Sequence, residues 1–160
     1  MVMRYFPNVL SRQESDASAD RIAAHLLEHG FTMWAVELIG IEPFIGFIGL
    51  WRTRFEAHFT PCVEIGWRLD QRYWGRGLAT EGARASLHFG FSQLKLPEIV
   101  AMTAVSNTPS RRVMQRLGMI HNPADDFEHP NVPSGHPLQR HVLYRLKAED
   151  FRLQEVAQSK

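Results

Sequence analysis

Apolar side chains recur at helical spacing near the start of the chain, where one stripe is formed by Ile22, Ala23, Leu26 and Leu27. Such a stripe is typical of a helix that buries one face. Residues 11–14 have the Ser-x-x-Glu spacing of a capping box, and Gly30 is the kind of residue at which helices end. We therefore predict a helix from about Arg12 to His29.

Strand patterns follow this helix. Phe31–Leu38 and Phe44–Trp51 are rich in aromatic and aliphatic residues and are separated by a short segment with Gly40 and Pro43, which predicts an antiparallel pair. The next strand, Val63–Leu69, alternates strictly. In a strand this alternation directs Val63, Ile65, Trp67 and Leu69 to one face and Glu64, Gly66 and Arg68 to the other.

A turn over Asp70–Trp74 and a pair of glycines lead into a predicted helix from about Leu78 to Gln93. Glu98–Val105 then has the composition of another strand. A strand, a helix and a strand within about 40 residues indicate a crossover that connects two parallel strands.

The remaining elements are shorter. We predict a helix over Pro109–Leu117 that ends at Gly118, a strand over His141–Leu146 and a short helix from Ala148. Two segments read as connections: Arg52–Pro61, with some strand character, and Asn122–Pro137, which holds four prolines. The fold class is therefore α/β or α+β, with one mixed sheet and flanking helices.

Length and composition limit the alternatives. The chain has 160 residues, the size of one domain, and 44% of them are hydrophobic, as in an ordinary globular protein. The formal net charge of +1 gives no electrostatic reason to expect a nucleic-acid partner or a membrane surface. No apolar run has the length of a membrane helix and no signal peptide is evident, so we expect a cytoplasmic protein. With a single cysteine, Cys62, an internal disulfide is excluded.

The glycine turn between the third strand and its helix is the most informative segment. Gly75 and Gly77 can adopt backbone angles that direct successive amides into one concavity, and the free amides at the start of the helix add partial positive charge. Arg72 and Arg76 could add charge from either side. The segment has neither the Gly-Lys-Ser/Thr of a nucleoside-triphosphate loop nor the third glycine of a dinucleotide fingerprint, since Thr80 stands there. It predicts a site for a diphosphate, or else a turn that only links strand and helix.

The run Arg72–Gly77 resembles the Gln/Arg-x-x-Gly-x-Gly/Ala motif of the GNAT N-acetyltransferases. The wider run Tyr73–Glu81 is typical of the branch that contains the ribosomal-protein N-terminal acetyltransferases. A second block, Asn107-x-x-Ser110 followed by Leu117-Gly118-Met119, agrees, as does Glu64–Trp67 before the loop. The resemblance extends from about Met3 to Leu146.

The resemblance implies a GNAT fold in which the two parallel strands, Val63–Leu69 and Glu98–Val105, splay apart. It implies acetyl-CoA as co-substrate; we expect no metal, because the chain has a single cysteine. The pantetheine would lie along the backbone of Trp67 and Leu69, and the asparagine of the second block would contact coenzyme A. The expected contacts with the cofactor are Trp67, Leu69, Arg72, Trp74, Gly75, Arg76, Gly77, Leu78, Ala79, Thr80 and Asn107.

Acetyl transfer to an amine needs a base, because the ammonium form is not a nucleophile. Glu64 is the first candidate, since a carboxylate beside a ligand cleft can have a raised pKa. The structural alternative is a solvated strand glutamate paired with Arg68.

The general acid is less evident from the sequence. Many family members place a tyrosine seven residues after the asparagine, and Met114 stands there in this chain. Ser110 could supply a hydrogen bond to the sulfur or to coenzyme A, or could only start its helix. A third alternative is that the thiolate takes its proton from the attacking amine.

Several other residues have structural interpretations beside functional ones. His121, His129, His136 and His141 do not have the spacing of a zinc site. Tyr144 could face the acceptor pocket or be packed in the sheet. Arg111 and Arg112 could reach the adenosine phosphate or lie on a solvated helix face. We interpret the four tryptophans, Trp34, Trp51, Trp67 and Trp74, as core and pocket walls.

The sequence therefore predicts an N-acetyltransferase that acts by direct transfer to a small-molecule amine or a protein N-terminus. The alternative is a catalytically silent acyl-CoA-binding module of the same fold. A homodimer is left open. We expect one domain over residues 1–160 that lacks a strand and a helix which relatives carry before the segment matching Met3–Phe6.

Overall fold

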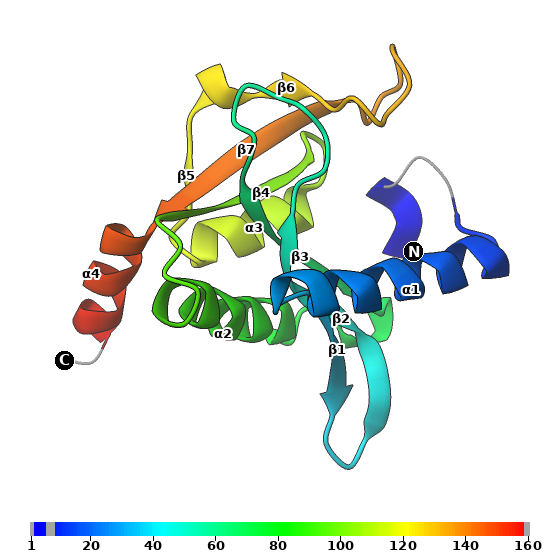
Figure 1. The fold of residues 1–160 in the computed structure, drawn as a ribbon, viewed down its shortest axis with the longest axis horizontal. Helices are drawn as coiled ribbons and strands as arrows, with labels where there is room; N and C mark the ends of the chain where they lie inside the picture. Colours follow the sequence, from blue (N-terminus) through cyan, green and yellow to red (C-terminus); the bar gives the residue numbers. More distant parts are fainter. Residues whose placement is uncertain (1, 6–8, 159–160) are drawn as a thin grey trace.

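The computed structural model describes residues 2–5 and 9–158, which form a single seven-stranded sheet with helices on both faces (Figure 1). The strand order is β1-β2-β3-β4-β7-β5, and β6 pairs with β7. Every pair is antiparallel except β3 and β4, which run parallel. The mixed sheet with flanking helices predicted from the sequence is thereby confirmed, and most of its strand pairs are antiparallel. In chain order the elements are η1 (Val2–Tyr5), α1 (Arg12–His29), β1 (Met33–Leu38), β2 (Glu42–Arg52), β3 (Val63–Leu69), η2 (Gln71–Tyr73), α2 (Leu78–Ser92), β4 (Glu98–Ala104), α3 (Thr108–Arg116), β5 (Ile120–His121), η3 (Pro123–Asp125), β6 (Phe127–Glu128), β7 (Arg140–Lys147) and α4 (Ala148–Gln158).

Local sequence signals fix α1 at both ends. Ser11 caps the helix by accepting a hydrogen bond from the backbone of Glu14, whose carboxylate accepts one from the backbone of Ser11 in return. Gly30 ends the helix in the left-handed conformation, with φ of 75°. Both boundaries coincide with the predicted ones because each depends on contacts within four residues.

Two predictions about connections are wrong. The segment after Arg52 contains no strand before β3 begins at Val63, because Phe55 and Phe59 turn inward and pack against Phe127. The segment Asn122–Pro137 is not all loop, since it contains η3 and β6 and is preceded by β5. Each of those two strands has only two residues, too few to show alternation.

The two faces of the sheet are packed differently. Ile48 and Leu50 of β2 and Ile65 of β3 are buried on the face that α2 covers. The residues that alternate with these along β2 and β3 lie on the opposite face. There the ring of His25 from α1 stacks on Trp51, with 4.0 Å between the ring centroids. The part of the chain that the structure describes includes no helix long and apolar enough to cross a bilayer.

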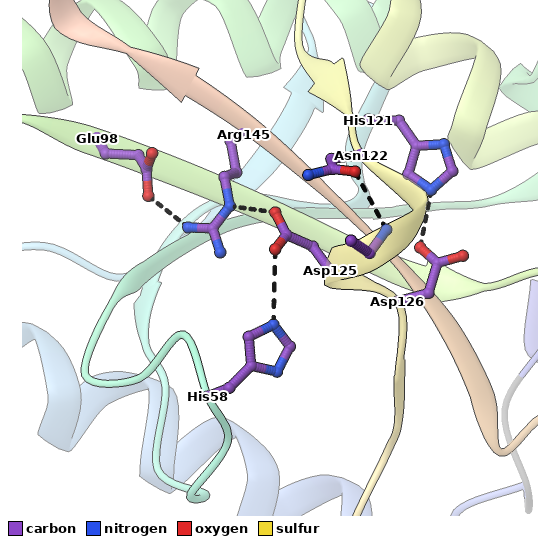
Figure 2. A network of polar contacts seen from close by, with 8 residues as sticks. His58, Glu98, His121, Asn122, Asp125, Asp126 and Arg145 are labelled. Atoms are coloured by element: carbon purple, nitrogen blue, oxygen red, sulfur yellow. Dashed lines mark hydrogen bonds and ion pairs between the residues drawn. The ribbon is translucent and has the colours of Figure 1, made fainter.

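A network of charged side chains joins two connecting segments to strands β4 and β7 (Figure 2). Arg145 of β7 donates to Glu98 of β4 and to Asp125 of η3, with both distances 2.8 Å. His58, from the segment before β3, lies 3.8 Å from the same Asp125, and His121 bonds Asp126 at 2.7 Å. The network therefore holds residues 53–62 and η3 against β4 and β7.

His25 joins α1 to the sheet through two backbone contacts. Its side chain is fully buried, its Nε2 accepts the N–H of Arg52 at 3.0 Å, and its Nδ1 lies 2.8 Å from the carbonyl oxygen of Phe31. The neutral tautomer with the proton on Nδ1 satisfies both groups. Burial lowers the pKa of His25, because protonation would charge a desolvated ring and remove the acceptor for Arg52.

We predict that His25→Leu lowers the free energy of unfolding by about 2–4 kcal/mol, because two buried backbone groups lose their partner. Since the folded-state pKa is lowered from 6.5, His25 stabilises the fold above that pH and its contribution is lost as the pH falls. Urea unfolding at pH 7 and pH 5 should show a shallower pH dependence in the variant. His88→Leu, at an exposed histidine of α2, is the control. An equal loss in both variants would contradict the role assigned to His25.

Candidate functional site

Strands β3 and β4 part soon after they meet. Their one paired position is Glu64 with Val100, and neither strand has a further partner on that side toward Leu69 or Ala104. The N–H of Asp70 donates to the carbonyl of Ile45 in β2. Backbone groups of successive residues in a strand point to opposite sides, so those of Leu69 and Trp67 point away from β2 and into the gap. The gap therefore has a polar main-chain edge.

A cavity of about 730 Å³ occupies this gap and opens onto both faces of the sheet. On the α2 face it is lined by the glycine turn, the start of α2 and residues of α3. On the α1 face it is bounded by side chains that we call the α1-side chamber: Tyr5, Met33, Phe47, Trp51, Glu64, Arg68, Met102, His129, Val132, Leu138 and His141. A ligand that passes through the gap can thus meet a second ligand from the other face.

The glycine turn has the conformation that the sequence predicts. Gly75 and Gly77 have φ of 75° and 83°, which is the left-handed region, and both line the cavity. Gly77 is also the N-cap of α2 and offers no side chain to the helix. The amides of Leu78, Ala79 and Thr80, all cavity-lining, therefore have no acceptor within the helix and form a site for negative charge.

The charged and aromatic residues of the turn are distributed more widely than predicted. The indole of Trp74 donates to the carbonyl of Leu69 at 2.9 Å and lines the cavity. Arg72 is paired with Asp70 at 2.7 Å. Arg72 and Arg76 lie over the ring of Tyr73, at 5.5 Å and 5.8 Å, and neither is among the residues that line the cavity.

Glu64 lies at the junction of the gap and the α1-side chamber. Burial raises the pKa of Glu64 to about 7, since an ionised carboxylate is poorly solvated there. This environment favours the interpretation of Glu64 as a base over that of a solvated strand glutamate. A carboxyl with this pKa can exchange a proton with a ligand near neutral pH.

Ser110 lies across the gap from β3 and joins β3 to α3. The indole N–H of Trp67 donates to its hydroxyl oxygen at 3.3 Å, and the amide of Asn107 donates to the same oxygen at 3.1 Å. Because the oxygen accepts both bonds, the hydroxyl proton is left to point elsewhere. Asn107 caps α3 by accepting from the backbone of Ser110, and it also donates to Thr103 at 2.8 Å. Both residues line the cavity and both hold α3 in place.

The structure distinguishes between the functional and the structural interpretations of several residues. Tyr144 is only 2% exposed and packs in the core, outside the cavity lining. Arg112 lines the cavity, whereas Arg111 donates to the carbonyl of Val105. Met114 is buried at the edge of the cavity. Trp51, Trp67 and Trp74 line the cavity, and Trp34 packs against Phe89.

The sequence reasoning missed two parts of the α1-side chamber. The sequence suggests Arg68 only as an ion-pair partner of Glu64, yet it lines the chamber with its guanidinium 5.2 Å over the ring of Phe47. His129 and His141 lie 4.7 Å apart, and burial lowers the pKa of both, that of His129 to about 4. The strand alternation was a signal for Arg68; nothing local pairs the two histidines. No group of metal-ligating side chains occurs within residues 2–5 and 9–158.

Comparison with known proteins gives consistent matches. The family model described as "Acetyltransferase (GNAT) domain" matches residues 1–120. The uncharacterized N-acetyltransferase YnaD of Bacillus subtilis is 33% identical over 55% of this chain and 50% of its own length. The FsC-acetyl coenzyme A-N(2)-transacetylase of Aspergillus fumigatus is 32% identical over 58% of this chain and 39% of its own length. This chain therefore covers half or less of these two relatives.

A solved structure, the acetyltransferase (GNAT family) of Bacillus anthracis, is also similar. It superposes with a TM-score of 0.72 at 30% identity, over 92% of this chain and 82% of that one. The similarity thus extends over most of this chain.

We predict that Glu64→Gln raises the melting temperature at pH 8 and changes it little at pH 5. The raised pKa means that ionisation of Glu64 destabilises the folded state once the pH exceeds its unfolded pKa near 4.5, and fully so above about 7. A neutral amide removes that cost. Calorimetry at the two pH values checks this, with Glu37→Gln at an exposed site of β1 as the matched control. No gain at pH 8 would show that water solvates the Glu64 carboxylate.

Proposed function

The chain belongs to the acetyltransferase (GNAT) family, and we propose that it transfers an acetyl group from acetyl-CoA directly to a primary amine of a small molecule or a protein N-terminus. The observation that carries the proposal is the cavity through the split sheet, with main-chain donors at one end and a carboxyl of raised pKa at the other.

The α2 face of the cavity fits coenzyme A. The amides of residues 75–80 would hold the diphosphate, at a helix start whose N-cap gives no side-chain bond. The backbone of Trp67 and Leu69 would pair with the amide groups of the pantetheine. Trp74 and Asn107 are proposed contacts with coenzyme A because both line the cavity. Arg72 and Arg76 are also proposed contacts, and each would reach the cofactor by moving away from the ring of Tyr73.

In the proposed reaction the amine nitrogen attacks the carbonyl carbon of the thioester, a C–N bond forms, the C–S bond breaks, and coenzyme A leaves as the thiolate. Glu64 accepts a proton from the ammonium form of the acceptor, directly or through water. Main-chain amides that face the gap would polarise the carbonyl oxygen.

Ser110 is the proposed donor to the sulfur. Two hydrogen bonds into its oxygen direct the hydroxyl proton away from Trp67 and Asn107, toward the cavity that Ser110 lines. Met114, at the position of the family tyrosine, has no proton to give. The second proton on the attacking nitrogen passes to the thiolate, and Ser110 is proposed to hydrogen-bond the sulfur and to relay that proton with no net loss of its own.

A silent acyl-CoA-binding module is the second candidate, and Met114 is the observation that favours it. Both candidates predict binding of acetyl-CoA, and only the first predicts release of free thiol when an amine is added. Titration calorimetry followed by a thiol-release assay over a panel of amines separates them.

We predict that Glu64→Gln lowers kcat at pH 7.5 by about 100-fold or more, the usual contribution of a general base. In the wild type, kcat/KM should rise with pH through about 7, as Glu64 loses its proton. Thiol release with one amine, measured from pH 6 to 9, checks both expectations. The Kd for acetyl-CoA should not change, and Glu37→Gln should behave as the wild type. Unchanged turnover in Glu64→Gln would remove Glu64 from the mechanism.

We predict that Gly75→Ala and Gly77→Ala each weaken acetyl-CoA binding by about 10-fold. An L-residue costs about 1–2 kcal/mol in the left-handed conformation, so the turn would relax and its amides would no longer converge. Gly135→Ala is a matched control, because Gly135 has φ of 77°, has open space where a β-carbon would lie and is outside the cavity lining. Calorimetry should show similar losses of stability in all three variants, but weaker binding only in the first two. Equal affinities would place the diphosphate elsewhere.

A further inference from the structure

The charges of the α1-side chamber restrict the kind of amine that it can accept. Among the described residues that line the whole cavity, Glu64 is the sole carboxylate. The chamber also contains the cation Arg68 and two histidines whose lowered pKa keeps them uncharged at neutral pH. An acceptor with several positive charges would meet one carboxylate and one cation, whereas an acceptor with a negative group would find a partner in Arg68.

Arg68 and Glu64 are fixed on the same face of β3. They stand four residues apart, which is ~13 Å along a strand at about 3.3 Å per residue. Phe47 is the residue directly opposite Arg68 in β2, and the guanidinium lies over its ring at 5.2 Å. This stacking places the guanidinium over a ring that stands beside its own position on the strand.

Between these two charged side chains, the surface of the sheet is apolar and carries no protruding side chain from β2 or β3. Gly66 lies midway on β3 and faces Gly49 of β2, so neither strand projects a side chain there. The thioether of Met33 lies beside Gly66, and its methyl carbon would be 3.2 Å from a β-carbon at that position. Such a floor suits a chain of methylene groups, because methionine adapts its shape to what it packs against.

We propose that the acceptor is a small amine with a carboxylate at the other end of a short apolar chain, bound with the amine at Glu64 and the carboxylate at Arg68. Contacts of about 3 Å at each end leave ~7 Å between the two groups of the ligand, or roughly four to six bonds. The inference rests on the proposed acetyl transfer and names its substrate class. Arg68 is then the residue that determines specificity for the acceptor.

Two matched series of amines test this inference with the full-length protein. The first is the ω-amino acids from glycine to 6-aminohexanoate, and the second is the n-alkylamines of the same chain lengths. Spermidine and a short peptide amide with a free N-terminus complete the panel. Thiol release at pH 7.5 gives kcat/KM for each.

We expect kcat/KM to rise along the ω-amino acids toward those with four to six bonds between nitrogen and carboxyl carbon. These should exceed the alkylamines of equal length by at least 10-fold. In Arg68→Gln that advantage should disappear, because kcat/KM should fall at least 10-fold further for these ω-amino acids than for the alkylamines of equal length. Arg68→Lys should keep part of the advantage, and Arg21→Gln, on the exposed face of α1, should keep all of it.

Each other outcome overturns a defined part of the proposal. Alkylamines, spermidine or the peptide amide that react as fast as the best ω-amino acid would overturn the substrate class and leave acetyl transfer intact. Fastest turnover with glycine would overturn the spacing between Glu64 and Arg68. Absence of turnover with every amine would overturn both this inference and the proposed transfer. If Arg68→Gln does not fold, the wild-type comparison of the two series still decides the substrate class.

Discussion

Strands β3 and β4 are paired at Glu64 and Val100 and then diverge, although each keeps its antiparallel neighbour on the outer side. A sheet opened in this way leaves backbone donors and acceptors without strand partners, and such groups are costly to bury. The described side chains compensate in part. Trp74 donates to the carbonyl of Leu69, whereas Trp67 spans the gap by bonding the side chain of Ser110. The remaining groups face a cavity that a ligand with amide groups could enter and pair with.

The position of Glu64 follows from the same divergence. It is the residue of β3 that is paired with β4, and its side chain lines the cavity that begins where the strands part. Burial without a compensating charge raises its pKa to about 7. The geometry that would let this carboxyl accept a proton in the proposed reaction is therefore the geometry that makes its ionised form unfavourable in the folded protein.

Local signals in the sequence predicted the elements that depend on neighbours along the chain. The capping box at Ser11, the left-handed glycines at 30, 75 and 77, and the alternation of Val63–Leu69 all lie within a few residues of what they determine. The short strands β5 and β6 could not be predicted, because their pairing with β7 depends on the placement of the whole sheet.

The site was predictable to the same extent. The turn that is proposed to hold a diphosphate could be identified from two glycines, and Glu64 from its place before that turn. The contact of Arg68 with Phe47 requires the register between β2 and β3, and the approach of His129 to His141 requires a loop to fold back on β7. Neither has a signature in sequence spacing.

The two ends of the cavity differ in how much of their lining is main chain and how much is side chain. The α2 face offers main-chain groups from the edge of β3 and the turn at residues 75–80, whereas the α1-side chamber is a set of side chains from η1, from strands β1 to β4 and from residues 129–141. Point mutations replace side chains and leave peptide groups in place. Such an arrangement lets evolution, or a protein engineer, reshape the second compartment one residue at a time while the first is inherited almost unchanged.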